Sequence, residues 1–150
     1  MKYLRLSGLL LVMLLAGCAK PEIIELPFIK FKILDRGQSS GVTFSKLFHI
    51  TKQQDFLDLW TIHSAPNGKP PPRVDFEQDM VIAAFLGERR TGGYDIYVHS
   101  IEELENELVA NIVIVVPPPD SMRSMMISQP YMFVSLPMSN KPVRFNTTQK

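Results

Sequence analysis

The sequence predicts a mainly β (α+β) protein, with an antiparallel, sandwich-like β domain and one helix. Short runs rich in β-branched and aromatic residues recur along the chain, and segments rich in Gly, Pro or polar residues separate them. One segment instead repeats its apolar residues with helical spacing. A length of 150 residues, 45% of them hydrophobic, fits a single globular domain and excludes a largely disordered chain.

Residues 1–17 have the features of a bacterial lipoprotein signal peptide. Lys2 and Arg5 precede an apolar run, Leu6–Gly17, that is shorter than the roughly 20 residues needed to cross a bilayer. The run ends in "LAGC", which resembles a lipobox, and Cys18 is the one cysteine of the chain. We therefore expect cleavage before Cys18 and lipid on its thiol, where each buried methylene contributes about 0.8 kcal/mol to membrane binding.

Removal of the signal peptide changes the charge of the chain. Two of the 16 Lys and Arg residues would be lost, which leaves 14 against 15 Asp and Glu. This balance excludes the basic surface of a nucleic-acid binder. Ala19 and Lys20 differ from the acidic inner-membrane retention signal of known lipoproteins. By resemblance to the sorting of known lipoproteins, the lack of that signal favours a lipid-anchored protein of the cell envelope, on an outer membrane and facing the periplasm or the surface. An ordinary signal peptide with an incidental Cys18 is the alternative.

Two strands are predicted in the first part of the domain, which spans residues 28–138 after a tether at 18–27. The run "FIKFKIL" (28–34) alternates apolar and basic residues with the period of a half-buried strand. The segment "RGQSSG" ends it. The run "VTFSKLFHI" (42–50) is the second strand.

One helix is predicted after the second strand. Thr51 and Gln54 have the spacing of a capping box, in which both side chains satisfy free N–H groups at a helix start. An apolar stripe then continues for about three turns. It consists of Phe56, Leu57, Leu59, Trp60 and His63. The next segment, "SAPNGKPPPRVDF", is a loop, because three consecutive prolines cannot join a helix interior or a central strand.

Met80–Leu86 is almost continuously apolar, which predicts a central strand covered on both faces, with the helix on one of them. Two further runs, 94–101 and 108–116, flank "EELENE". We expect a hairpin here, because the β-branched residues of the second run favour a strand. The alternative is a helix over 100–108, since "SIEE" also resembles a capping box.

The C-terminal part begins where Pro117–Pro119 end the preceding strand. The segment "DSMRSMMISQP" is a long connection with room for one strand, and "YMFVSLP" (131–137) is the last strand. Residues 139–150 are polar and are predicted to form a flexible tail. Met132 is expected in the core, whereas the methionines of the connection either form an adaptable contact surface or fill the core.

The stretch "GERRTGGY" (87–94) lies between two strand-like runs. Gly92 and Gly93 would let the backbone take positive φ values that other residues resist, so we expect a hairpin turn. Arg89 and Arg90 are interpreted as solvated charges, and pairing with Glu88 or with an acidic partner is the alternative.

Four segments together resemble one family. They are "VDF" (74–76), "VIAAFLGERRTGGYDIYV" (81–98), the proline-rich break (117–120) and "SQPYMFVSLP" (128–137). They are similar to the PrcB family, the protease complex subunit domain of bacterial surface lipoproteins. The similarity covers roughly residues 56–137, and its most specific part is the G-E-R-x-T-G-G-Y loop followed about 35 residues later by Q-P-Y. The resemblance implies a non-catalytic accessory subunit that binds a secreted or surface protease.

Antiparallel neighbouring strands would gather three loops at one end of the domain: 91–94, 117–120 and 129–131. Loops that are stiff before binding lose little entropy on association. Tyr94 and Tyr131 would be the anchors, because tyrosine is enriched at binding hot spots. The predicted partner-binding residues are Thr91, Gly92, Gly93, Tyr94, Gln129, Pro130 and Tyr131. Packing over the end of the sheet is the alternative role for Tyr94.

No catalytic site is expected. His49, His63 and His99 share no local spacing with one another or with a carboxylate that would indicate a metal site. No Ser elbow, Walker loop or HExxH motif is present. We therefore expect no enzyme, metal, cofactor or small-molecule substrate. The expected partners are a protease or another envelope protein, and the membrane through Cys18. The alternative function is a structural envelope lipoprotein or scaffold that binds no protease.

Overall fold

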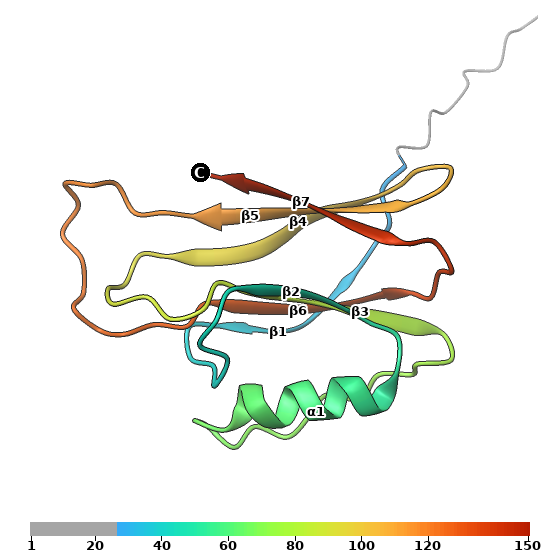
Figure 1. Ribbon diagram of the computed structural model, residues 1–150, viewed down its shortest axis with the longest axis horizontal. Coiled ribbons are helices and arrows are strands. Elements are labelled where there is room, and N and C mark those ends of the chain that lie inside the picture. The colour runs from blue at the N-terminus through green and yellow to red at the C-terminus, as the bar shows by residue number, and fades with distance from the viewer. Residues whose placement is uncertain (1–26) are drawn as a thin grey trace, which may run out of the picture.

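The computed structural model describes residues 27–150, so the predictions for the signal peptide and for lipid on Cys18 lie outside the described residues. The described part forms two sheets and one helix (Figure 1). The strands are β1 (Lys32–Gly37), β2 (Lys46–Ile50), β3 (Asp79–Phe85), β4 (Asp95–Glu103), β5 (Leu108–Val115), β6 (Tyr131–Pro137) and β7 (Val143–Gln149), and the helix is α1 (Gln53–Ser64). The predicted class, a mainly β domain with one helix, is confirmed.

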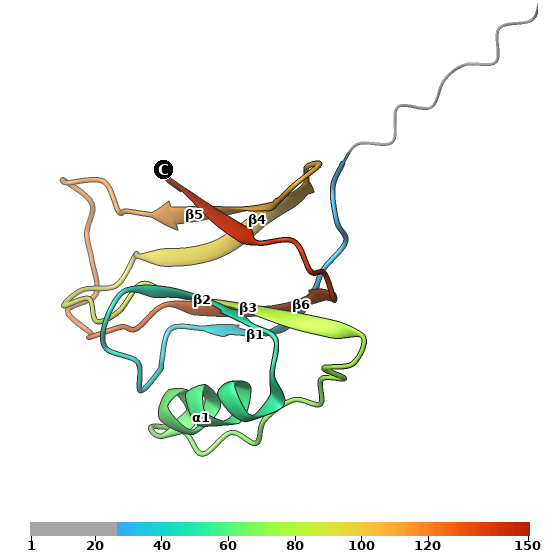
Figure 2. The same ribbon diagram turned by 45° about the vertical axis from the view of Figure 1, so that its right-hand side comes forward.

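The two sheets stack as a sandwich, and α1 covers the outer face of the larger one (Figures 1 and 2). The larger sheet has the order β1-β6-β3-β2 and is antiparallel throughout. The smaller sheet has the order β4-β5-β7, with β4 antiparallel and β7 parallel to β5. The central position predicted for the Met80–Leu86 run is confirmed, because β3 lies between β6 and β2.

Strand β3 is apolar at every position from Met80 onward because both of its faces are buried. Met80, Ile82 and Ala84 belong to the core between the two sheets. Val81 and Phe85 belong to a second core under α1. Alternate side chains of a strand point to opposite faces, so one strand supplies both cores.

Helix α1 contributes four buried side chains of its predicted stripe to the second core: Phe56, Leu59, Trp60 and His63. The capping box is wrong, because the N-cap is Lys52 and makes no side-chain cap hydrogen bond. The helix thus begins one residue later than the motif requires. Among residues 27–150, no helix is long and apolar enough to span a membrane.

The hairpin predicted between the two runs after Tyr94 is confirmed, and the alternative of a helix over 100–108 is wrong. Strands β4 and β5 pair up to Glu103 and Leu108, and four residues connect them. The β-branched side chains of β5 fit the pleated surface, which outweighs the local helical spacing.

Both N-terminal strands have shifted boundaries. Strand β1 begins at Lys32 and continues through Gly37, because this segment pairs with β6. Phe28 forms only an isolated bridge to Glu102. Strand β2 is shorter than the predicted 42–50 run, because its pairing with β3 begins at Lys46.

The prediction of a flexible tail over 139–150 is wrong, because β7 pairs with β5 along its whole length. Val143 and Phe145 pack against the core between the sheets. The other residues of β7 are polar, because the outer face and the C-terminal end of this edge strand are exposed to water. These residues contribute to the sheet through backbone pairing with β5, which cannot be predicted from their polar side chains.

The hairpin turn predicted for 87–94 is also wrong. Strands β3 and β4 belong to different sheets, so this segment crosses from one sheet to the other. Residues 116–130 cross back from β5 to β6. Both crossings lie at the same end of the sandwich (Figure 1).

Candidate partner-binding site

The two crossing segments pair with each other through their backbones. Arg89 N–H donates to Ser128 O at 2.8 Å, and Ser128 N–H donates to Arg89 O at 2.9 Å. Further along, Gly92 N–H donates to Ser124 O at 2.9 Å. Backbone bonds at both ends of the contact hold each segment in one arrangement.

Three glycines of the 87–94 segment lie where neighbouring atoms leave little room for a side chain. Gly93 has a φ of 90°, and an added Cβ would lie 3.0 Å from the Cβ of Pro117. Gly92 has no positive φ, so the expectation of a left-handed backbone holds for Gly93 alone. Gly87, which the sequence did not single out, has a φ of 76° and would place a Cβ 2.7 Å from the carbonyl carbon of Phe44.

An open groove of about 790 Å³ lies between the crossing segments and the end of β1. Its lining consists of Gln38, Ser39, Gly92, Gly93, Tyr94, Asp95, Val115, Met126, Ile127, Ser128 and Gln129. The structure therefore brings together the 91–94 and 129–131 loops, as predicted. Four of the predicted partner-binding residues line the groove: Gly92, Gly93, Tyr94 and Gln129.

The remaining predicted residues do not line the groove. The carbonyl of Thr91 accepts a hydrogen bond from Ser128 Oγ at 3.4 Å. Pro130 is buried. In the 117–120 loop, Pro117 is buried against Gly93, while residues 118–120 are exposed beside the groove.

Tyr131 is 2% exposed, so the anchor role predicted for it is wrong. Its ring belongs to the core under α1, because the strand alternation turns position 131 toward the helix. Tyr94 is half-buried and packs against the core between the sheets. The guanidinium of Arg89 lies 5.6 Å from the centre of the Tyr94 ring, a cation–π contact, so this arginine is not merely solvated.

Four exposed apolar side chains form a rim beside the groove, which we call the methionine rim. The exposed fractions are 103% for Met122, 84% for Met125, 73% for Met126 and 60% for Ile127. Met132 is 2% exposed, which confirms its core position. The exposure of Met122, Met125 and Met126 therefore fits an adaptable contact surface and not filling of the core.

The backbone beneath the methionine rim is held by Arg123. One of its terminal nitrogens, Nη2, donates to the carbonyls of Pro118 and Pro119 at 2.7 and 2.9 Å. Ser121 Oγ also donates to Pro118 O at 2.7 Å. The 117–120 and 121–127 segments therefore support each other, and the rim is fixed at its base.

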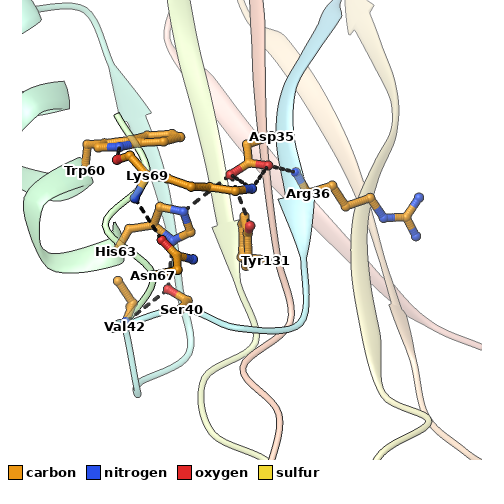
Figure 3. A network of polar contacts seen from close by, with 9 residues as sticks. All are labelled: Asp35, Arg36, Ser40, Val42, Trp60, His63, Asn67, Lys69 and Tyr131. Carbon is orange, nitrogen blue, oxygen red and sulfur yellow. Dashed lines mark hydrogen bonds and ion pairs between the residues drawn. The ribbon is translucent and has the colours of Figure 1, made fainter. Parts of the chain in front are cut away.

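The groove wall formed by Gln38 and Ser39 continues into a polar network that is buried at Ser40 and His63 (Figure 3). Ser40 Oγ lies 3.0 Å from His63 Nδ1, and His63 Nε2 lies 3.6 Å from Asp35 Oδ2. Lys69 Nζ donates to both carboxylate oxygens of Asp35, at 2.8 and 3.0 Å. Tyr131 O–H donates to Asp35 Oδ2 at 3.1 Å.

Ser40, His63 and Asp35 follow one another in the order of a hydrolase triad, but the site is closed. His63 is 0% exposed and Ser40 is 2% exposed. Ser40 Oγ also accepts the N–H of Val42 at 3.0 Å. Ser40 therefore cannot reach a substrate as a nucleophile. The contacts of the network instead join α1 to β1 and to the groove wall.

Burial and neighbouring charges shift the pKa values in this network. Burial lowers the pKa of His63, and the nearby carboxylate of Asp35 opposes this shift only in part. Burial raises the pKa of Asp35, but the Lys69 and Tyr131 hydrogen bonds outweigh it, so the net shift is downward. Burial and Asp35 raise the pKa of Tyr131. Among residues 27–150, no three His, Cys, Asp or Glu side chains gather as a metal site would require.

No local sequence pattern indicates this network. Asp35, Ser40, His63, Lys69 and Tyr131 come from five segments and meet only in the folded chain. His63 was expected on the buried stripe of the helix, where it lies, but its partners are distant in sequence.

In the comparison with known families, residues 80–137 match the family model described as PrcB C-terminal. Comparison with curated proteins and with solved structures gave no match. The matched segment runs from β3 through β6 and contains both crossing segments. The family resemblance predicted from the sequence is confirmed over this segment.

Proposed function

We propose, from the PrcB C-terminal match over residues 80–137, that this protein is a non-catalytic accessory subunit of a secreted or surface protease. It binds the protease at the groove between the crossing segments. The observation that carries this proposal is the pairing of the two segments inside the matched region, which prepares a concave surface before any partner arrives. Preformed loops lose little conformational entropy on binding.

The surface chemistry around the groove supports a protein partner. The methionine rim exposes apolar, flexible side chains that adapt to a partner, which is a common use of methionine at binding surfaces. Tyr94 and Gln129 supply polar atoms at the groove wall. Large exposed apolar side chains grouped beside a groove are typical of interaction sites.

The course of the chain places the groove away from the point where the described domain begins. Pro27 O accepts the N–H of Glu103 at 2.6 Å, beside the β4–β5 hairpin. Figure 1 shows this hairpin and the crossing segments at opposite ends of the sandwich. Eight residues lie between Cys18 and Pro27, so the distance between these two residues is about 32 Å at most. A lipid on Cys18, which we propose on an outer membrane, would therefore attach the domain by the end opposite the groove.

Co-purification tests this function. The full chain and a Met125→Glu/Met126→Glu variant are expressed in the native host, and the bound proteins are identified by mass spectrometry and assayed for proteolysis. We expect the native chain to recover a protease and the variant to lose at least nine tenths of it. Leu104→Ser, which removes an exposed apolar side chain at the opposite end, serves as the control and should retain the protease. Recovery of envelope scaffold proteins alone would favour the structural alternative and overturn the proposal.

A further inference from the structure

The outer edge of β2 is open within residues 27–150. Strand β3 pairs with one side of β2, and no described strand pairs with the other. The pairing with β3 runs from Lys46 to Ile50 without a bulge, so the edge is regular. A regular edge presents N–H and C=O groups that can pair with an added strand.

The other edges of the described sheets are interrupted or polar. Strand β1 has a register shift between Ile33 and Asp35. Strand β4 has a shift before Ser100 and is bordered by the incoming chain, since Ile29 N–H donates to Ile101 O at 2.8 Å. Strand β7 is exposed and polar over its last four residues. Bulges and polar side chains protect an edge from pairing. Strand β2 has no bulge, and its exposed polar side chains are Lys46, at its start, and His49.

A groove of about 450 Å³ lies between β2 and α1. Phe44 and Ile62 line it and are 52% and 53% exposed. Phe48 faces the helix side, where it packs against the core under α1. Helix α1 runs back beneath the sheet after β2 (Figure 1), so the groove follows the open edge.

The groove is acidic where it meets the start of the helix. Asp55 and Asp58 line it from α1, and within residues 27–150 neither forms an ion pair. Gln54 Nε2 donates to Asp58 Oδ1 at 2.8 Å, which leaves the negative charge in place. The cation on β2, Lys46, lies at the other end of the strand with its Nζ 5.0 Å from the centre of the Phe48 ring.

We propose that the β2 edge and this groove form a second binding site, which takes an extended polypeptide segment of another protein as an added strand. Backbone pairing with β2 would hold the segment. Alternate side chains would enter the groove, a basic one over Asp55 and Asp58 and an apolar one over Phe44 and Ile62. Binding by strand addition with pockets for alternate side chains is an established mode of peptide recognition. This site is separate from the groove between the crossing segments and does not depend on a protease partner.

Nuclear magnetic resonance with two matched peptides tests the site. The probes are acetyl-TVTKTVT-amide and acetyl-TVTETVT-amide, added to the labelled full chain. We expect chemical-shift changes in β2 and α1, slower amide exchange in β2, and affinity for the lysine peptide about threefold to tenfold higher. This range follows from gaining an exposed ion pair and removing a like-charge contact.

Surface variants separate the two contributions. Asp55→Asn/Asp58→Asn should remove the preference for lysine, and Phe44→Ser/Ile62→Ser should weaken both peptides. The control is Ile33→Ser on β1, at the other edge of the same sheet, which is 52% exposed like Phe44 and should change neither affinity. Absence of shift changes at β2 up to the solubility limit, equal changes at β7, or a lysine preference that survives loss of both carboxylates would overturn the proposal.

Discussion

The Nε2 atom of His63 lies 3.6 Å from Oδ2 of Asp35, and this nitrogen is buried without a hydrogen-bond partner in the described structure. The carboxylate of Asp35 is instead held by Lys69 at 2.8 Å and by Tyr131 at 3.1 Å. A neutral imidazole tolerates this position better than a charged one, because burial penalises the charge.

The lowered pKa of His63 predicts a loss of stability in mild acid. The unfolded chain takes up a proton near the ordinary pKa of 6.5, whereas folded His63 takes it up only at lower pH. The free energy of unfolding should therefore fall as the pH drops below about 6.5, toward the lowered pKa. Chemical denaturation from pH 8 to 5 measures this. His49, whose pKa burial also lowers, contributes in the same direction. His63→Gln should therefore reduce the pH dependence without abolishing it, and an unchanged slope in that variant would contradict the prediction.

Asp35→Asn should lower the free energy of unfolding by about 1–2 kcal/mol at neutral pH, because it removes the charge that Lys69 approaches. The folded-state pKa of Asp35 is lowered, so the stabilisation is present above pH 3.8 and disappears as the pH falls through the lowered value. The native chain and the variant should therefore converge in stability at the acid end. Asp120→Asn, an exposed position, is the control and should differ little from the native chain.

Gly87→Ala should destabilise the protein by about 2–4 kcal/mol. The left-handed backbone is strained for alanine, and the new Cβ would lie 2.7 Å from the backbone of Phe44. Gly68→Ala is the matched control: its φ is 64°, but nothing lies within 4 Å of the added atom. It should cost about 1–2 kcal/mol, from strain alone. Equal losses measured by thermal or chemical unfolding would refute the close contact at Gly87.

Phe145→Ala should lower the free energy of unfolding by about 1–3 kcal/mol, because this half-buried ring packs on the core between the sheets. Thr147→Ala, on the exposed part of β7, should be nearly neutral. Hydrogen exchange should also show protected amides in β7. A neutral Phe145→Ala variant with rapid exchange would mean that the C-terminal segment is loose after all.

The strand-rich class, the helix stripe and the β4–β5 hairpin could be predicted because each depends on local patterning. The continuous apolar run of β3 even indicated burial on both faces. Strand β7 could not be predicted in this way, since its polar side chains disguise a backbone that pairs with β5. The crossing between sheets at 87–94 was read as a hairpin because glycine spacing does not specify which sheet the next strand joins.

The candidate site was predictable in its loops and less so in its individual side chains. The gathering of Gly93, Pro117 and Gln129 at one end was expected from neighbouring antiparallel strands, but it arises because both crossings between the sheets lie at that end. Whether Tyr131 faces solvent or helix depends on the register of β6, which a single sequence does not fix. The Asp35–His63 contact joins a strand to a helix and has no local motif.

Site-specific photo-crosslinking tests most directly the claim that the groove between the crossing segments binds a protease. The photoreactive residue benzoyl-phenylalanine replaces Met126 at the methionine rim in one variant and Leu104 at the opposite end of the sandwich in the other. The account predicts a protease adduct from position 126 and none from position 104. An adduct from position 104 alone, or no protease adduct from position 126, would contradict it.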